Sequence, residues 1–257
     1  MPRRGKTAPP ETHAPPETHA PPQETHAPPP DGEEELYASQ QYWRQRYAAC
    51  APETDTFEWF LDWESLAPLL DGCLKKRHDV LDVGCGASTL LMDMRAAGYG
   101  GRLVGVDYVR EALDVVRAAA AAARVDLVVG DCRDLDFCDG EFDAVVDKGT
   151  VDAMISGGPD AVVAACAECA RVLRHGGRFV VCSHHRADAD GDLDDDAWLG
   201  AVVGGLASRD EADAAAWRLD VHTLAGAAEG DAPCVYVFTK CRSHRGAGLE
   251  VEFHEHG

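Results

Sequence analysis

Short apolar runs alternate with longer amphipathic segments between residues 78 and 183. The short runs predict strands at 78–84, 102–107, 125–131, 142–147 and 178–183. The longer segments carry apolar residues at helical spacing and predict helices at 88–98, 109–124 and 159–177. Strands and helices that alternate at such short spacing are typical of a parallel sheet with helices on both faces.

Further elements flank this alternating region. Apolar residues at helical spacing predict two helices before it, over 33–50 and 57–74. After it, 215–224 and 234–240 are strand-like segments joined by a short loop, and they predict a hairpin. The sequence therefore predicts an α/β fold, a Rossmann-like doubly wound, mostly parallel seven-stranded sheet with a C-terminal antiparallel hairpin.

Low-complexity sequence precedes the predicted fold. The unit ETHAPP occurs three times within residues 1–32. Proline and polar residues at this density bury too little apolar surface to fold. We expect residues 1–32 to be disordered, residues 33–245 to form one folded domain, and residues 246–257 to be a flexible tail.

Charge and hydropathy narrow the classes of partner. The chain has 24 Lys and Arg against 45 Asp and Glu, a formal net charge of −21. Phosphates would be repelled, which argues against nucleic acid and anionic membranes and favours a basic partner; the alternative is that the charge only keeps the protein soluble. No apolar run is long enough to span a membrane, and no apolar segment typical of a secretory leader follows Arg3 and Arg4. The ten cysteines are scattered along the chain, so we expect reduced thiols and a cytoplasmic protein.

A glycine pair follows the first predicted strand, in the stretch VLDVGCGAST. Gly84 and Gly86 let the backbone turn sharply and approach a ligand without a Cβ in the way. The N–H groups of the next helix then point at that ligand. The dinucleotide fingerprint requires a third glycine where Thr89 stands, which argues against a nicotinamide or flavin enzyme.

Acidic residues end the next two strands. Asp107 lies 21 residues after Gly86, where an acid accepts hydrogen bonds from ribose hydroxyls; the alternative is a helix N-cap. Asp131 ends the third strand beside Cys132 and can accept a hydrogen bond from the amine of adenine; the alternative is a solvated turn. The carboxyl ends of parallel strands share one edge of a sheet, so we expect these residues to meet.

The stretch FDAVVDKGTVDAM, residues 142–154, ends the fourth strand at the same edge. An apolar run is interrupted by Asp147 and Lys148, and Asp152 follows five residues after Asp147. We expect Asp147 and Lys148 to face the reactive end of a cofactor bound at this edge, and not bulk solvent.

These motifs, in this order, resemble the class I (seven-stranded) S-adenosylmethionine-dependent methyltransferases. Together with QYWRQRY and FEWF upstream, DKGTVDAM resembles a branch of protein-lysine methyltransferases that includes enzymes acting on translation elongation factor 1-alpha. The resemblance covers residues 36–183 well and the hairpin loosely. It implies S-adenosyl-L-methionine as cofactor, a basic protein such as elongation factor 1-alpha as substrate, and a methyltransferase domain over 33–245.

The resemblance also implies roles for residues around the cofactor. Trp43, Tyr47 and Trp59 are expected to close over it, and aromatic faces attract a cation such as its sulfonium. The alternative for Trp43 and Tyr47 is an apolar helix stripe that packs on the core. Lys148 is expected to reach the cofactor and pair with its carboxylate, and Asp147 is expected to face the substrate. For a lysine substrate, Asp147 and Asp152 are the catalytic candidates that orient the amine or pass on its proton.

The strand ends supply the other implied contacts. Gly84 and Gly86 would back the methionine and ribose portions. The ribose and adenine would meet the residues that end the second and third strands, which are Asp107, Tyr108, Asp131 and Cys132.

Two features depart from the resemblance, and two other readings stay open. Ala87 stands where family members commonly carry Asn, and residues 184–214 match no family pattern. One alternative is a class I enzyme that methylates a small molecule or another protein side chain. The other is a non-catalytic scaffold. We expect no metal site, although Cys166 with Cys169, and His184 with His185, have spacings seen in metal ligands.

Overall fold

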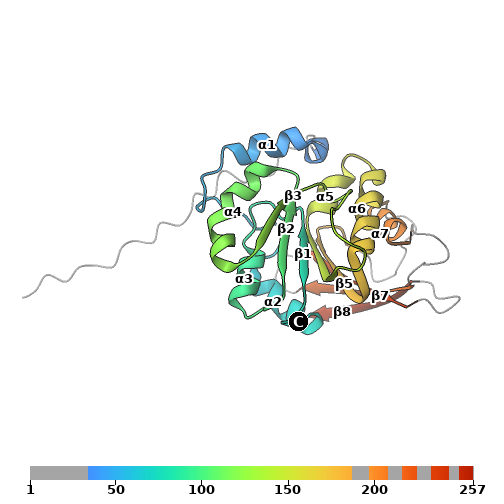
Figure 1. Ribbon diagram of the computed structural model, residues 1–257. Coiled ribbons are helices and arrows are strands. Elements are labelled where there is room, and N and C mark those ends of the chain that lie inside the picture. Colours follow the sequence, from blue (N-terminus) through green and yellow to red (C-terminus); the bar gives the residue numbers. More distant parts are fainter. Residues whose placement is uncertain (1–33, 187–196, 208–215, 225–232, 243–248, 257) are drawn as a thin grey trace, which may run out of the picture.

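The computed structural model describes residues 34–186, 197–207, 216–224, 233–242 and 249–256. The predicted disordered tail over 1–32 lies outside these residues. The described part contains one eight-stranded sheet with the order β3-β2-β1-β4-β5-β7-β6-β8 (Figure 1). Strands β3, β2, β1, β4 and β5 are parallel, whereas β7 is antiparallel to both β5 and β6. The predicted mostly parallel α/β sheet with an antiparallel hairpin is confirmed.

Strands β1 to β7 lie close to predicted positions, whereas β8 was not predicted. The strands are β1 (Val80–Val83), β2 (Leu103–Asp107), β3 (Asp126–Val129), β4 (Phe142–Lys148), β5 (Leu173–Ser183), β6 (Ala216–Leu224), β7 (Cys234–Cys241) and β8 (Glu250–His256). The helices are η1 (Glu34–Ala38, a 3-10 helix), α1 (Gln40–Ala48), α2 (Trp63–Cys73), α3 (Leu90–Ala96), α4 (Arg110–Ala123), α5 (Thr150–Ile155), α6 (Pro159–Val172) and α7 (Ala197–Ala207).

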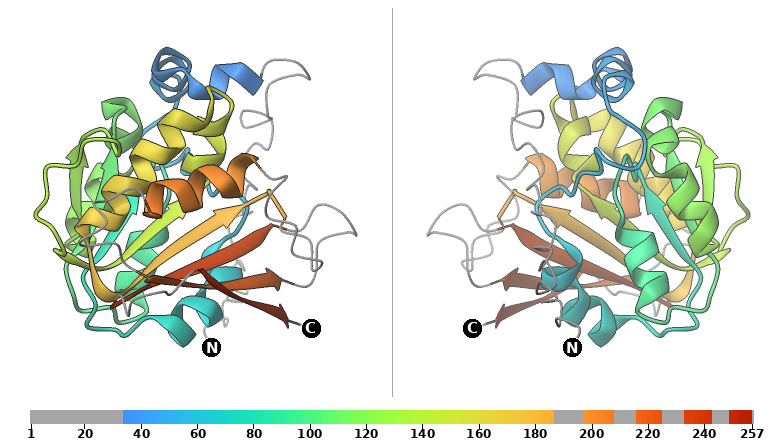
Figure 2. Two further views of the ribbon diagram at one scale, coloured as in Figure 1. Left: turned by 90° about the vertical axis from the view of Figure 1, so that its right-hand side faces the viewer. Right: turned by 90° about the vertical axis from the view of Figure 1, so that its left-hand side faces the viewer.

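Helices cover both faces of the sheet because the central strands are apolar on both faces. Leu81 and Val145 pack in one core cluster, which also contains residues of α6 and α7. Their neighbours Val80 and Val146 point the other way, into a cluster that contains residues of α2 and α3. The two layers of helices are visible on opposite sides of the sheet (Figure 2).

The N-terminal helices are shorter than predicted. The predicted helix over 33–50 is divided between η1 and α1, because Ser39 is extended and caps α1 by accepting a hydrogen bond from Tyr42 N at 3.4 Å. The predicted helix over 57–74 begins only at Trp63, where Asp62 caps it by accepting from Ser65 N at 2.9 Å. Residues 49–62 are thus a connecting segment.

The expected flexible tail over 246–257 is wrong for most of its length. Residues 250–256 form β8, which pairs in parallel with β6 and makes the sheet eight-stranded instead of seven. Alternation of apolar and charged residues in EVEFHEH suits an edge strand. The predicted domain boundary at residue 33 stays a prediction, whereas β8 extends the sheet beyond the predicted boundary at residue 245. Within the described ranges, no helix is long and apolar enough to cross a membrane.

Candidate active site

A cavity of about 220 Å³ lies at the carboxyl ends of β1, β2, β3 and β4. Its other side is formed by η1, α1 and the connecting segment 49–62, and α1 lies above this edge of the sheet (Figure 1). All ten residues predicted to bind the cofactor line it, namely Trp43, Tyr47, Trp59, Gly84, Gly86, Asp107, Tyr108, Asp131, Cys132 and Lys148. The structure therefore brings together residues spread over more than 100 positions; their contacts with a cofactor stay predictions.

The glycine turn fits a ligand that approaches the backbone closely. Gly84 and Gly86 both have left-handed backbones, with φ of +64° and +55°. A Cβ on Gly86 would lie 2.6 Å from Tyr47 Oη, and a Cβ on Gly84 would overlap the side chain of Thr150. Thr150 Oγ1 in turn donates to the carbonyls of Val83 and Gly84 at 3.1 and 3.2 Å. Glycine is required at both positions by conformation and by space.

Asp107 lies between the glycine turn and α4, whose N-cap is Val109 and not Asp107; its contact with a ribose stays a prediction. Its carboxylate accepts from Gly86 N at 2.9 Å and from Val109 N at 2.8 Å, so it joins the glycine turn to the start of α4. Burial raises the pKa of this carboxyl to about 6. Each oxygen keeps a further lone pair, and a carboxylate offers about four acceptor positions in all. Asp107 can therefore fix the turn and still accept bonds from a vicinal diol.

Asp131 is paired with a residue that received no role from the sequence. Arg133 Nη2 lies 2.6 Å from Asp131 Oδ2, and Arg133 N donates to Asp131 Oδ1 at 2.9 Å. The guanidinium holds the pKa of Asp131 below its usual range. The neighbouring Cys132 is buried, which raises the pKa of its thiol. This side of the cavity carries an acceptor, a neutral thiol and a planar cation.

Aromatic rings form the wall opposite the strand ends. Trp43 stacks on Tyr47 and on Tyr37 with ring centroids 6.1 and 5.6 Å apart, and its edge meets Trp59 at 6.0 Å. The guanidinium of Arg46 lies 5.7 to 5.9 Å from three of the wall's rings. We call Tyr37, Trp43, Tyr47, Phe57 and Trp59, all of which line the cavity, the aromatic wall. The sequence did not single out Tyr37 or Phe57, which are only two of many apolar aromatic residues.

Lys148 has a partner that sequence reasoning missed. Its ammonium forms an ion pair with the carboxylate of Glu58 and donates to Leu61 O at 3.2 Å. Lys148 lines the cavity as predicted, and its contact with a cofactor stays a prediction. The signal for Glu58 was present in FEWF, where only Trp59 had been assigned a role.

Asp147, predicted to face the substrate, is directed away from the cavity in the structure, and its catalytic role stays a prediction. Asp147 is fully buried and is not among the residues that line the cavity. Its carboxyl accepts a hydrogen bond from Val151 N at 3.2 Å, at the start of α5. Burial and the nearby Asp152 raise its pKa well above the usual range. Asp147 therefore shapes the turn between β4 and α5.

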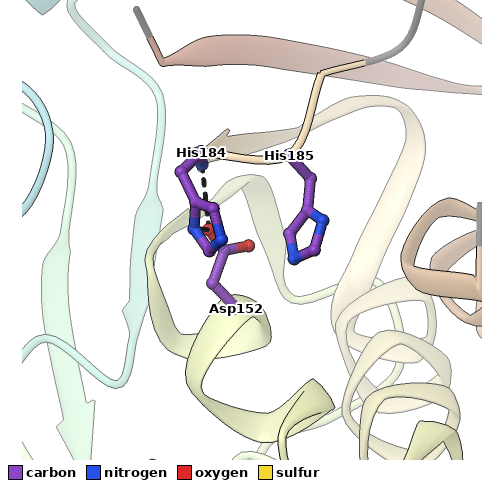
Figure 3. Close-up of side chains that lie close together, drawn as sticks. All are labelled: Asp152, His184 and His185. Atoms are coloured by element: carbon purple, nitrogen blue, oxygen red, sulfur yellow. Dashed lines mark hydrogen bonds and ion pairs between the residues drawn. The ribbon is translucent and has the colours of Figure 1, made fainter. Parts of the chain in front are cut away.

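Asp152 lies in a separate cluster at the end of β5 (Figure 3). Its buried carboxylate accepts from Ser183 Oγ at 2.8 Å and from His184 N at 3.0 Å, and it lies 2.8 Å from His184 Nδ1. The ring of His185 stands beside that of His184, with centroids 4.4 Å apart. Asp152, like Asp147, does not line the cavity, so its catalytic role stays a prediction.

The two residue pairs considered as metal ligands lie in different environments, one polar and one apolar. Asp152, His184 and His185 have donor atoms within 4.8 Å of one another, so they form a compact polar cluster. The carboxylate of Asp152 is, however, already engaged by hydrogen bonds. Cys166 and Cys169 are buried in the apolar core on α6, and burial raises the pKa of both thiols. These two cysteines are core residues.

Comparison with known proteins gives a family likeness over the central part of the chain. Residues 81–181, which contain β1 to β5 and the glycine turn, match the family model described as a methyltransferase domain. These residues are therefore similar to a methyltransferase domain, and their parallel strands and glycine turn agree with the resemblance to class I methyltransferases. S-adenosylmethionine is the cofactor of this domain, and the glycine turn, Asp107 and the aromatic wall fit such a group.

Two relatives match this chain over more residues than the family model does. The chain is 36% identical over 157 residues to mouse "EEF1A lysine methyltransferase 4", which covers 56% of this chain and 60% of that protein. It is 27% identical over 172 residues to "Protein-lysine N-methyltransferase EFM4" of Saccharomyces cerevisiae, covering 56% of this chain and 74% of that protein. The match thus spans about three fifths of the mouse protein's length.

A solved structure supports the same fold. A TehB-like SAM-dependent methyltransferase from Corynebacterium glutamicum superposes with a TM-score of 0.51 at 23% identity, covering 81% of this chain and 98% of that one. At this identity the likeness shows the fold, a methyltransferase-type sheet, and not the substrate.

Proposed function

We propose that this chain is an S-adenosylmethionine-dependent protein-lysine N-methyltransferase that acts on a basic protein of the elongation factor 1-alpha type. The observation that carries the proposal is the single cavity in which all ten predicted cofactor-contacting residues meet. The names of the mouse and yeast relatives support lysine as the acceptor and, for the mouse protein, elongation factor 1-alpha as the target. A cytoplasmic location belongs to the same proposal.

The cavity residues divide the work of holding the cofactor. Asp107 accepts from the ribose hydroxyls, and the turn at Gly84 and Gly86 provides backbone contacts in a space that no Cβ could share. Bound S-adenosylmethionine supplies an electrophilic methyl group. The aromatic wall excludes water from it and offers ring faces that attract a positive charge.

Charge favours a basic acceptor. The chain carries a net charge of −21, which accelerates the approach of a basic protein and repels nucleic acids. A lysine arrives protonated, and its amine becomes nucleophilic only after the proton is lost. Desolvation at the cavity mouth lowers the pKa of an amine and so favours the neutral form. Alignment of that amine with the methyl group then provides the rate acceleration expected of a positioned reactant pair.

Mass spectrometry of methylated proteins tests the proposal. The purified chain is incubated with isotopically labelled S-adenosylmethionine and, in separate reactions, with elongation factor 1-alpha, a mixture of basic proteins, and a metabolite extract. We expect label on lysine residues of elongation factor 1-alpha. Label confined to metabolites would support the small-molecule alternative, and no label anywhere together with no binding of S-adenosylhomocysteine would support the scaffold.

Two variants act as controls for that experiment. Asp107→Asn removes an acceptor from the cavity and is expected to abolish labelling. Asp136 is an exposed acid outside the cavity, and Asp136→Asn makes the same chemical change as Asp107→Asn. This control is expected to label the substrate as strongly as the unmodified chain does.

A further inference from the structure

Glu58 lies in the connecting segment 49–62 and is the centre of a hydrogen-bond cluster. Its carboxylate accepts from Ser88 Oγ at 2.8 Å, from Thr89 N at 2.6 Å and from Thr89 Oγ1 at 3.1 Å. It also forms the ion pair with Lys148. Donors from the turn after β1 and from the end of β4 therefore converge on one carboxylate that belongs to neither strand.

This cluster borders the cavity on several sides. Phe57 and Trp59, the chain neighbours of Glu58, belong to the aromatic wall, and two of its partners, Ser88 and Lys148, also line the cavity. Phe57 N donates to Ala87 O at 3.2 Å, which fixes the segment beside the glycine turn. Glu58 thus connects the segment that carries Phe57 and Trp59 to the ends of β1 and β4 through hydrogen bonds and an ion pair.

The charges near this end of the cavity match an amino acid. S-adenosylmethionine ends in an α-ammonium and an α-carboxylate, which need one negative and one positive partner. Lys148 supplies the positive group. Asp82 lines the cavity, and Glu58, which is not itself a lining residue, is the ion-pair partner of Lys148. Burial raises the pKa of Asp82 to about 7, so Asp82 is only partly ionised at neutral pH. Glu58 is more exposed, with 23% of its side chain accessible, and has an ammonium partner already.

We propose that Glu58 receives the α-ammonium of the cofactor while Lys148 turns to its α-carboxylate. Before the cofactor binds, Glu58 and Lys148 pair with each other. When it binds, its α-ammonium and α-carboxylate replace these two partners. Each charged side chain exchanges one opposite charge for another, so no buried charge is left unpaired. Because Glu58 sits between Phe57 and Trp59, the same contact holds the aromatic wall against the bound cofactor. This inference rests on the proposed function.

Three ligands that differ at the amino-acid end test the assignment by calorimetry. S-adenosylhomocysteine carries both charged groups, decarboxylated S-adenosylmethionine keeps only the ammonium, and 5′-methylthioadenosine lacks both. They are titrated into the full chain, into Glu58→Gln, and into Glu64→Gln as control. Glu64 is an exposed acid on α2 outside the cavity, and Glu64→Gln makes the same chemical change as Glu58→Gln.

The expected result is selective. Glu58→Gln should weaken S-adenosylhomocysteine and decarboxylated S-adenosylmethionine by roughly 10- to 100-fold, the usual effect of losing a charged hydrogen bond. It should leave 5′-methylthioadenosine within about twofold, which also reports a folded cavity. Glu64→Gln should leave all three unchanged.

Other outcomes separate the inference from the function. Unchanged binding of S-adenosylhomocysteine by Glu58→Gln would overturn the role of Glu58 and leave the proposed function intact. An equal loss for all three ligands would show that Glu58 only holds the cavity's shape, which also overturns the role. If the unmodified chain binds none of them, the proposed function fails and the inference fails with it.

Discussion

Replacement of Asp107 is the most direct test of the cavity as a cofactor site. In the structure this carboxylate accepts two backbone hydrogen bonds, from Gly86 N and Val109 N at 2.9 and 2.8 Å, and keeps one acceptor position on each oxygen for a ribose hydroxyl. A hydrogen bond to a charged group contributes about 1.5–3 kcal/mol, so loss of two to the ribose weakens binding by about 3–6 kcal/mol. This corresponds to at least roughly a 100-fold increase in Kd.

The choice of variant depends on the two backbone donors. Asp107→Ala leaves both N–H groups buried without an acceptor, at about 1–3 kcal/mol each, which is a large share of a domain's typical stability. Asp107→Asn keeps one acceptor oxygen and nearly the same shape, so it should fold while it loses affinity. Both variants are compared with Asp136→Asn by thermal unfolding and by calorimetry with S-adenosylhomocysteine.

One result would refute the reasoning. If folded Asp107→Asn bound S-adenosylhomocysteine within about threefold of the unmodified chain, Asp107 would not contact the ribose. Its carboxylate would then serve only the glycine turn and the start of α4, and the proposed orientation of the cofactor in the cavity would be wrong.

Three further predictions concern the glycine turn, a buried acid and the aromatic wall. Gly86→Ala should weaken cofactor binding in calorimetry because its Cβ would lie 2.6 Å from Tyr47 Oη at a φ of +55°. The double variant Gly86→Ala with Tyr47→Phe lacks that hydroxyl and should regain part of the affinity. If it regains none, the steric cause is wrong. Burial raises the pKa of Asp82 in the folded chain to about 7, so its contribution to stability is present at low pH and is lost as the pH rises towards 7. Between pH 5 and 8, the free energy of unfolding of Asp82→Asn should therefore rise by about 2–3 kcal/mol relative to that of the unmodified chain, as measured by thermal unfolding at each pH. A difference that stays constant with pH would contradict this. Trp43→Ala should weaken S-adenosylmethionine more than S-adenosylhomocysteine in calorimetry, because only the former is a sulfonium cation, and equal losses would mean that the wall acts by packing alone.

Local patterns were sufficient for the part of the site that lies at strand ends. Gly84 and Gly86 follow an apolar run and precede a helix, and Asp107 and Asp131 end two further runs. In a parallel sheet those ends share one edge, so the order of elements already placed these residues together. The structure confirms this placement in one cavity.

The tail was misjudged because its strand depends on a partner. Residues 250–256 alternate apolar and charged side chains, but a short segment of this kind is stable as a strand only beside another one. Strand β6 supplies that partner in the folded chain, where β8 pairs with it in parallel.

The sequence by itself determined the parallel α/β sheet, the glycine turn and the acids at its carboxyl edge, because these follow from local periodicity and from chain order. Tertiary structure decided the partners of the charged groups. Lys148 meets Glu58 across 90 positions of the chain, whereas its neighbour Asp147 turns inward to the start of α5. Adjacent side chains of a strand point to opposite faces, and only the packing of a distant segment on one face determines which charge lies at the cavity and which is buried.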